Sequence, residues 1–263
     1  ADGTASHDVT ITIVGANDPA DITVDVGNGD SDAGTVTEDG ATDADNNTFE
    51  TVSGTLTVSD VDGTGNASEA IFQVQDDVAD GNYGTFSIDV DGNWSYELNN
   101  THSDVQSLKA GETLTRTITV TSADGTASHD VTITIVGAND GPIAVDDEIF
   151  IAEDVVFNST VDLDANDSDL DGDALSVIEG TFTTTEGGTI VIAADGSYSY
   201  TPPLDFNGVD TVEYTVTDGT ATDTATLTIN VGAENDAPDL VADVDSVDEN
   251  TTVTADAANG VLS

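Results

Sequence analysis

The sequence predicts an all-β protein built from tandem antiparallel β-sandwiches in an extended array. Short runs of alternating apolar and polar residues, separated by Gly and Asp turns, are typical of half-buried strands. Among the acids, Asp outnumbers Glu 41 to 12, which favours turns over helices. One long segment also occurs twice without change, and such an internal repeat indicates a repeat architecture.

The composition excludes several classes of partner. The 263 residues carry 2 Lys and Arg against 53 Asp and Glu, a formal net charge of −51. Two cationic residues are too few to neutralise nucleic-acid phosphates or to dock the chain on an anionic bilayer. No apolar run approaches the about 18 residues of a membrane span, so we expect no direct membrane insertion. Cysteine is absent, which excludes disulfides and thiolate metal sites, while oxygen-ligated hard cations remain possible.

The repeat sets the expected module boundaries. Residues 1–18 (ADGTASHDVTITIVGAND) recur unchanged at 123–140, and a looser copy covers 218–236. Each copy has an Asp-Gly turn, an alternating strand and a short linker ending in Asn-Asp, followed within two residues by proline. The chain begins in mid-pattern, without a signal peptide, and so resembles a piece of something longer. The expected units are the last strand of a preceding repeat (1–18), two complete sandwiches (19–140 and 141–236), and the opening strands of a following, truncated repeat (237–263).

A hairpin recurs inside each complete module. Residues 84–96 (GTFSIDVDGNWSY) and 188–200 (GTIVIAADGSYSY) place an Asp-Gly turn between two alternating strands, which is a strong hairpin signal. The aromatic residues of the returning strand are expected in the core, and exposure as a sugar platform is the alternative. Residues 104–109, closed by Gly111, suggest one brief helical turn.

Strand length places acidic residues at the ends of the modules. Pro142 and Glu153 are 11 residues apart, and an extended run of this length covers about 36 Å, the height of a small sandwich. We therefore expect Glu153 at the far pole, beside the linker Asn235-Asp236. The returning chain should bring the acidic loop 164–173 to the near pole, beside Asn139-Asp140.

We expect a bound cation wherever these acidic residues cluster, because their negative charges repel one another. Two carboxylates about 5 Å apart repel by roughly 3 kcal/mol at an effective dielectric constant of 20. Calcium accepts about six to eight carboxylate, amide and carbonyl oxygens with flexible geometry, whereas magnesium demands a strict octahedron. The segment from Asp167 to Gly172 matches the start of an EF-hand loop, but Ile178 stands at the glutamate position and strands flank it. The alternative, solvated turns in a salt-adapted protein, explains the charge but not the spacing.

The motifs resemble the VCBS-type and cadherin-like (Ig-like) tandem repeats of giant bacterial surface adhesins, often of the RTX class. Four features of this chain resemble the VCBS-type pattern: VTEDG (36–40), GTLTVSDVDG (54–63), GTFSIDVDGNWSYEL (84–98) and the two identical copies of the repeat. The cadherin-like pattern resembles NDSDLDGDAL (166–175) and YTVTDGT (214–220). This resemblance covers essentially the whole chain and implies linkers that bind calcium and stiffen a long extender.

The resemblance also implies ligand roles. Glu153 resembles the first-strand glutamate, Leu204-Asp205 the start of the LDRE motif, Asp169 and Asp171 the DxD pair, and Asp218 the late aspartate. Asn207 stands where a further glutamate is expected, and Gly137-Ala138 stands where a linker acid is expected. The resemblance therefore implies fewer ions per junction than in cadherins. The candidate Ca²⁺ ligands are Asn17, Asp18, Glu38, Asp39, Asp60, Asp62, Asp124, Asn139, Asp140, Glu153, Asp154, Asp164, Asp167, Asp169, Asp171, Asp205, Asp218, Asn235, Asp236 and Glu249.

An enzyme is not expected. Ser128, His129 and Asp130 are triad residue types, but consecutive strand residues point to opposite faces and cannot form a relay. Carboxylate pairs could serve glycoside hydrolysis, yet acids are too abundant here for any pair to be informative. The only cations, Lys109 and Arg116, are expected to pair with nearby carboxylates.

The expected function is therefore a stiff extracellular spacer on the bacterial cell surface, with the neighbouring repeats of the same chain as its partners. One alternative is an adhesion module that binds a glycan or peptide through an exposed Trp94, Tyr198 or Tyr200. Another is end-to-end strand pairing between copies, because 1–18 and 237–263 are strands without their own modules.

Overall fold

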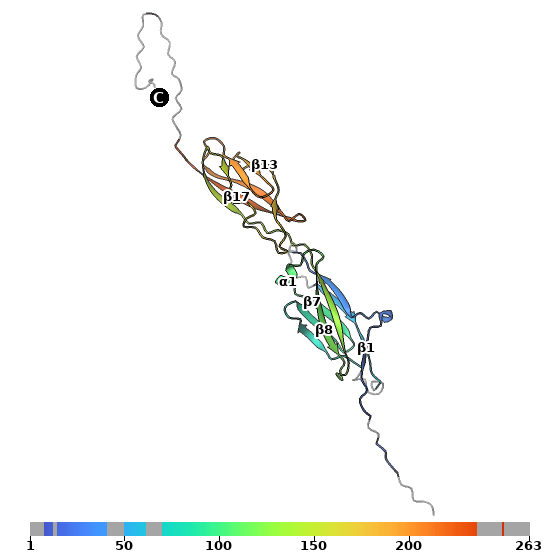
Figure 1. The fold of residues 1–263 in the computed structure, drawn as a ribbon. Coiled ribbons are helices and arrows are strands. Elements are labelled where there is room, and N and C mark those ends of the chain that lie inside the picture. Colours follow the sequence, from blue (N-terminus) through green and yellow to red (C-terminus); the bar gives the residue numbers. More distant parts are fainter. Residues whose placement is uncertain (1–7, 13–14, 41–49, 62–69, 236–248, 250–263) are drawn as a thin grey trace, which may run out of the picture.

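The structure is a computed structural model that describes residues 8–12, 15–40, 50–61, 70–235 and 249. Strands are the main regular structure of the described residues, with very little helix, so the all-β prediction is confirmed. The strands make two β-sandwiches that lie end to end along the chain (Figure 1). One short α-helix, α1 (Ser103–Gln106), lies close to the expected helical turn. A 3-10 turn, η1, covers Val26–Asn28.

The first sandwich packs a four-stranded sheet, in the order β3-β7-β6-β5, against a three-stranded sheet, in the order β2-β9-β8. A two-stranded ribbon, β1-β4, lies beside them. The strands are β1 (Asp21–Thr23), β2 (Ala33–Thr37), β3 (Thr51–Thr55), β4 (Thr57–Ser59), β5 (Gln75–Ala79), β6 (Gly84–Ile88), β7 (Asn93–Leu98), β8 (Thr113–Thr121) and β9 (Ser128–Val136).

The second sandwich has two four-stranded sheets, in the orders β10-β17-β16-β12 and β11-β15-β14-β13. Its strands are β10 (Asp147–Ala152), β11 (Phe157–Asn158), β12 (Ser176–Val177), β13 (Gly180–Thr183), β14 (Thr189–Ile192), β15 (Tyr198–Thr201), β16 (Gly208–Thr217) and β17 (Thr222–Gly232). The pairing is antiparallel except that β2 joins β9, and β10 joins β17, in parallel. In both sandwiches an early strand therefore runs alongside the last strand towards the same pole.

Each sandwich has its own hydrophobic core. Alternate residues of β9 and of the hairpin β6-β7 fill the first core, where Trp94 and Tyr96 are buried. The matching hairpin β14-β15 buries Tyr198 and Tyr200 in the second core. Both hairpins turn at glycines with positive φ, Gly92 at +87° and Gly196 at +80°, as the Asp-Gly signal predicts. The core position expected for these aromatic residues is confirmed.

The repeated segment occupies two different environments. In β9, Val131 and Ile133 are 0% exposed, whereas the identical Val9 and Ile11 are 77% and 78% exposed in an extended stretch outside the sheets. Burial of these side chains thus depends on the partners β2 and β8 and not on the local sequence. The assignment of 1–18 to a preceding repeat, and the boundaries at 19–140 and 141–236, stay predictions. Of the expected following repeat, all but Glu249 lies outside the described residues.

Candidate cation site at the junction between the sandwiches

A glutamate lies at the far pole of each sandwich, just after the strand that runs parallel to the last one. In the second sandwich, Glu153 N–H donates to Gly232 O at 3.0 Å, and the Glu153 carboxylate accepts from Glu234 N–H at 2.7 Å. Glu153 therefore lies beside the chain that leaves β17, where the spacing from Pro142 predicts it. In the first sandwich, Glu38 N–H donates to Val136 O at 3.0 Å, and its carboxylate accepts from Ala138 N–H at 2.7 Å.

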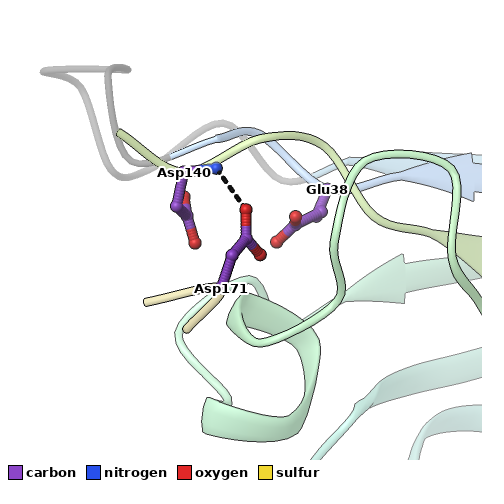
Figure 2. Close-up of side chains that lie close together, drawn as sticks. All are labelled: Glu38, Asp140 and Asp171. Carbon is purple, nitrogen blue, oxygen red and sulfur yellow. Dashed lines mark hydrogen bonds between the residues drawn. The ribbon is translucent and has the colours of Figure 1, made fainter. Parts of the chain in front are cut away.

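Three carboxylates from both sandwiches meet at the junction (Figure 2). Glu38 follows β2, Asp140 ends the linker after β9, and Asp171 belongs to the loop between β11 and β12. One oxygen of each lies within 4.8 Å of the others, and the residues are only 3%, 0% and 5% exposed, respectively. The backbone N–H of Asp140 donates to Asp171 Oδ2 at 2.8 Å, which fixes the loop of the second sandwich against the linker.

A second group of carboxylates shares Asp171. Asp169, Asp171 and Asp173 each place an oxygen within 4.8 Å of the other two. The turn that brings them together has Gly172 at a φ of +67°, and Asp169 Oδ1 accepts from Asp173 N–H at 3.1 Å. Alternate aspartates of the acidic loop therefore face one another, and Asp171 is common to both groups.

The electrostatics disfavour these charges in the absence of a cation. Burial raises the pKa of Glu38 to about 7, and the neighbouring Asp140 and Asp171 add to the effect against the opposing hydrogen bond from Ala138. Burial likewise raises the pKa of Asp171, with Asp169 and Asp173 contributing. Raised pKa values mean that the folded protein disfavours the ionised carboxylates, so a bound cation would relieve the repulsion.

Several buried oxygens at the junction end of the first sandwich and in the acidic loop 164–173 of the second accept no hydrogen bond from the described residues. Asp171 Oδ1, Asp169 Oδ2 and Asn100 Oδ1 are all buried without a hydrogen-bond partner within the part of the chain that the structure describes. Buried polar atoms in proteins are nearly always satisfied, and each exception needs a cause. Carboxylate and amide oxygens are the ligands that calcium takes. The donor set therefore fits a hard cation.

The connection from β7 to β8, residues 99–112, adds contacts that the sequence did not reveal. Gln106 Nε2, in α1, donates to Glu38 Oε2 at 3.1 Å, and Asn100 Nδ2 donates to Asp39 O at 3.3 Å. Lys109, in the same connection, forms an ion pair with Asp173 of the second sandwich. Asn and Gln are common in loops, so their presence in this connection did not predict a contact with the junction. The length of the connection was the only feature of the sequence that could have indicated one.

The linker asparagines show the same arrangement at two places. Asn139 Nδ2 donates to Asp218 Oδ2 and to Asp140 O, both at 2.8 Å. Asn17 Nδ2 donates to Asp124 Oδ2 and to Asp18 O, both at 3.1 Å. The near pole of the first sandwich therefore repeats the linker contacts of the junction, and the buried Asp60 also belongs to this sandwich.

Other candidate ligands lie apart from the two carboxylate groups. The N–H of Asp205 donates to Asp154 Oδ1 at 2.9 Å, in the loops next to Glu153. Asp167 Oδ1 accepts from Val145 N–H at 2.8 Å, and Asp164 contacts the turn at Gly196. Asp62 and Asp236 fall outside the described residues, as do the chain neighbours of Glu249, while Asn235 ends the described part of its linker.

Neither the triad residue types nor the aromatic residues form a second site. His129 Nε2 lies 2.9 Å from Asp32 Oδ2, whereas Asp130 Oδ1 accepts from Thr119 Oγ1, so the strand separates these side chains as predicted. The side chains of Trp94, Tyr198 and Tyr200 are buried in the two cores. They are therefore not placed to form an exposed binding platform.

Comparison with known proteins finds one matching family. A family model described as bacterial cadherin-like domain matches residues 17–137 and 139–233. No curated protein matches. No helix among the described residues is long and apolar enough to span a membrane.

The structural matches include cadherins and an enzyme. An endo-fucoidan hydrolase of glycoside hydrolase family 107 has 18% identity and a TM-score of 0.29, with 81% of this chain and 30% of the hydrolase covered. Protocadherin gamma B7 domains 1–4 has 15% identity and a TM-score of 0.43, with 79% and 51% covered. Human protocadherin-24 domains 1–2 has 14% identity and a TM-score of 0.43, with 84% and 100% covered. The chain thus spans less than a third of the hydrolase and about half of the gamma B7 fragment.

Proposed function

Because the chain belongs to the bacterial cadherin-like domain family, we propose that it is an extender segment of a large extracellular adhesin on the bacterial surface, stiffened by calcium between its repeats. One observation carries this proposal. Glu38 of the first sandwich and Asp171 of the second lie in one buried carboxylate group, together with the linker residue Asp140. A cation at this group would join the two sandwiches directly.

The residues that would hold the ion supply oxygen only. Glu38, Asp140 and Asp171 would each contribute a carboxylate oxygen. Calcium suits a set of this kind because its coordination number and geometry are adaptable, whereas magnesium prefers to retain several waters in an octahedron. The raised pKa of Glu38 also means that a proton and the ion compete for this carboxylate.

The ion would act on the stiffness of the junction. A ligand that binds only the ordered junction stabilises it by RT ln(1 + [L]/Kd), or about 2.7 kcal/mol when calcium exceeds Kd by about a hundredfold. Without calcium, the carboxylates of the two sandwiches would repel one another and loosen the junction. The rod would therefore be stiff where calcium is plentiful and looser in a cytosol that is poor in calcium.

The remaining candidate ligands suggest similar junctions at both outer poles. Asn17, Asp18, Asp60 and Asp124 would face a preceding repeat, and Glu153 with Asn235 would face a following one. A VCBS-type repeat within an RTX adhesin remains part of the same proposal. A catalytic role is not proposed, since the matching family model describes a cadherin-like domain.

Small-angle X-ray scattering of this chain, in calcium and in chelator, tests the proposal. We expect the maximum dimension to be larger and the flexibility lower in calcium, and Asp171→Asn to abolish the difference. Asp130→Asn is the matched control, because Asp130 is an exposed residue of β9 that lies outside both carboxylate groups. An identical scattering curve for the unaltered chain with and without calcium would show that the ion does not set the shape.

A further inference from the structure

Lys109 crosses the junction to the acidic loop of the second sandwich. Its ammonium group forms a hydrogen-bonded ion pair with the Asp173 carboxylate. The hydrogen bond from Asp173 raises the pKa of Lys109, and the neighbouring carboxylates of Asp171 and Glu112 act in the same direction. Lys109 is one of only two cationic residues in a chain of net charge −51. Its position on this carboxylate group therefore needs an explanation.

The carboxylates that Lys109 meets have the form of a cation site. Asp169, Asp171 and Asp173 place oxygens within 4.8 Å of one another. Asp171 is only 5% exposed. Among the residues that the structure describes, neither Asp171 Oδ1 nor the buried Asp169 Oδ2 has a hydrogen-bond partner. Two of the three carboxylates thus offer oxygens that no protein donor satisfies, while Lys109 contacts the third.

Arg116, the other cationic residue, is paired within the first sandwich. Arg116 donates to both oxygens of Asp80, at 2.7 and 2.8 Å, within the first sandwich. Its guanidinium also lies 4.3 Å from the centre of the Tyr83 ring. Lys109 is consequently the one cationic side chain of this chain that reaches the junction. A lysine ammonium is a compact point charge on a flexible stem, which suits it to take the place of a metal ion.

We propose that the Lys109 ammonium replaces a second divalent ion at Asp169, Asp171 and Asp173, so that this junction binds one calcium ion fewer than its carboxylates could hold. The inference rests on the proposed calcium junction and adds the residue that limits its stoichiometry. An ammonium bonded to Asp173 removes one of the three carboxylates from coordination and repels a divalent ion at the other two. The calcium shared by Glu38, Asp140 and Asp171 is left in place.

The charge of Lys109 also stabilises the junction when calcium is absent. It offsets part of the repulsion among the loop carboxylates and ties residue 109 of the first sandwich to residue 173 of the second. The tether is weaker than an ion bridge, because both side chains are partly exposed, at 44% and 31%. The Lys109–Asp173 ion pair is therefore a contact across the junction that does not depend on calcium.

Counting bound calcium tests the inference. Equilibrium dialysis with calcium would compare the unaltered chain with Lys109→Gln, and we expect the variant to bind one additional ion per chain. Thr181→Glu is the matched control, since it changes the net charge by the same amount at an exposed residue of β13. This control should bind the same number of ions as the unaltered chain.

Each outcome is decisive. Equal stoichiometry in Lys109→Gln and the unaltered chain would overturn the inference, as would an equal gain in Thr181→Glu, which would reflect net charge alone. Failure of the calcium junction itself has a different signature, because Asp171→Asn would then bind as many ions as the unaltered chain. Circular dichroism of each variant verifies that its sandwiches are folded before the ions are counted.

Discussion

The carboxylate of Glu38 accepts a hydrogen bond from the N–H of Ala138 at 2.7 Å, although the two residues are 100 positions apart in the sequence. The contact joins the end of β2 to the linker that leaves β9. Glu153 makes the equivalent contact with Glu234 in the second sandwich. A glutamate at the far pole therefore holds the exit of the chain in both sandwiches, and Glu38 also belongs to the carboxylate group at the junction.

Replacing Glu38 with glutamine separates two roles of this side chain, the hydrogen bond that it accepts from Ala138 and the negative charge that it brings to the junction. The amide oxygen of Glu38→Gln can still accept from Ala138, but the negative charge is lost. We expect calcium affinity at the junction to fall at least about tenfold, because charged ligands dominate calcium binding in proteins. Isothermal titration calorimetry measures the change. Glu148→Gln, at an exposed residue of β10, should leave the affinity unaltered, and an unchanged Kd in Glu38→Gln would remove Glu38 from the ligand set.

The pKa of Glu38 predicts how pH affects the calcium-free protein. Burial raises this pKa from 4.5 to about 7, so between these values the folded state binds more protons than the unfolded state. The contribution of Glu38 to stability is then fully present below pH 4.5 and is lost as pH rises through 7. The loss amounts to at most about 3 kcal/mol.

Urea unfolding in chelator at pH values from 5 to about 8 measures this contribution. The chain has many other acids, so the informative quantity is the difference between the unaltered chain and Glu38→Gln. That difference should change with pH in favour of the glutamine variant as pH rises. Parallel pH profiles for the two proteins would contradict the assignment of a raised pKa to Glu38.

The parts of the site that the sequence predicts are those fixed by strand length. The 11 residues from Pro142 to Glu153 span the sandwich, so the position of Glu153 follows from extended geometry. The same reasoning brings Asp171 to the linker at Asp140, where the structure has a hydrogen bond of 2.8 Å. Hairpins and core aromatics follow from alternation and from Asp-Gly turns, because these signals are local.

Contacts made by the irregular connection between β7 and β8 could not be predicted. Asn100, Gln106 and Lys109 reach the junction only because residues 99–112 fold back against the linker. No periodic pattern specifies that packing. Val9 and Val131 make the same point for a strand, since identical local sequences are exposed in one place and buried in the other.

The identical repeats provide a matched pair of glycine substitutions. At Gly137, an added Cβ would lie 2.1 Å from Leu108 O and 2.5 Å from Lys109 O, both of which are backbone atoms. Gly137→Ala should therefore displace the linker from the connection that carries Lys109. We expect a loss of more than about 1 kcal/mol in stability and a weaker calcium site, measured by urea unfolding and calorimetry.

Gly15 occupies the corresponding position in the other copy of the repeat. A Cβ at Gly15 would meet nothing within 4 Å, so Gly15→Ala should alter stability by less than about 0.5 kcal/mol. The two variants share their local sequence, and a difference between them reports the packing alone. Equal effects at both positions would show that the contact with Leu108 does not hold the linker.

Trp94 distinguishes a spacer from a module that binds ligands through exposed aromatics. Its side chain is 2% exposed, its Nε1 donates to Ser31 O at 2.7 Å, and its ring lies 6.2 Å from that of Phe86. Because this is the only tryptophan in the chain, its fluorescence reports one environment. We expect a blue-shifted emission that neither soluble glycans nor calcium alters, since the indole is buried and its N–H is already paired with Ser31 O. Quenching by a glycan at a concentration that leaves the protein folded would instead place a ligand against this ring and favour the binding module.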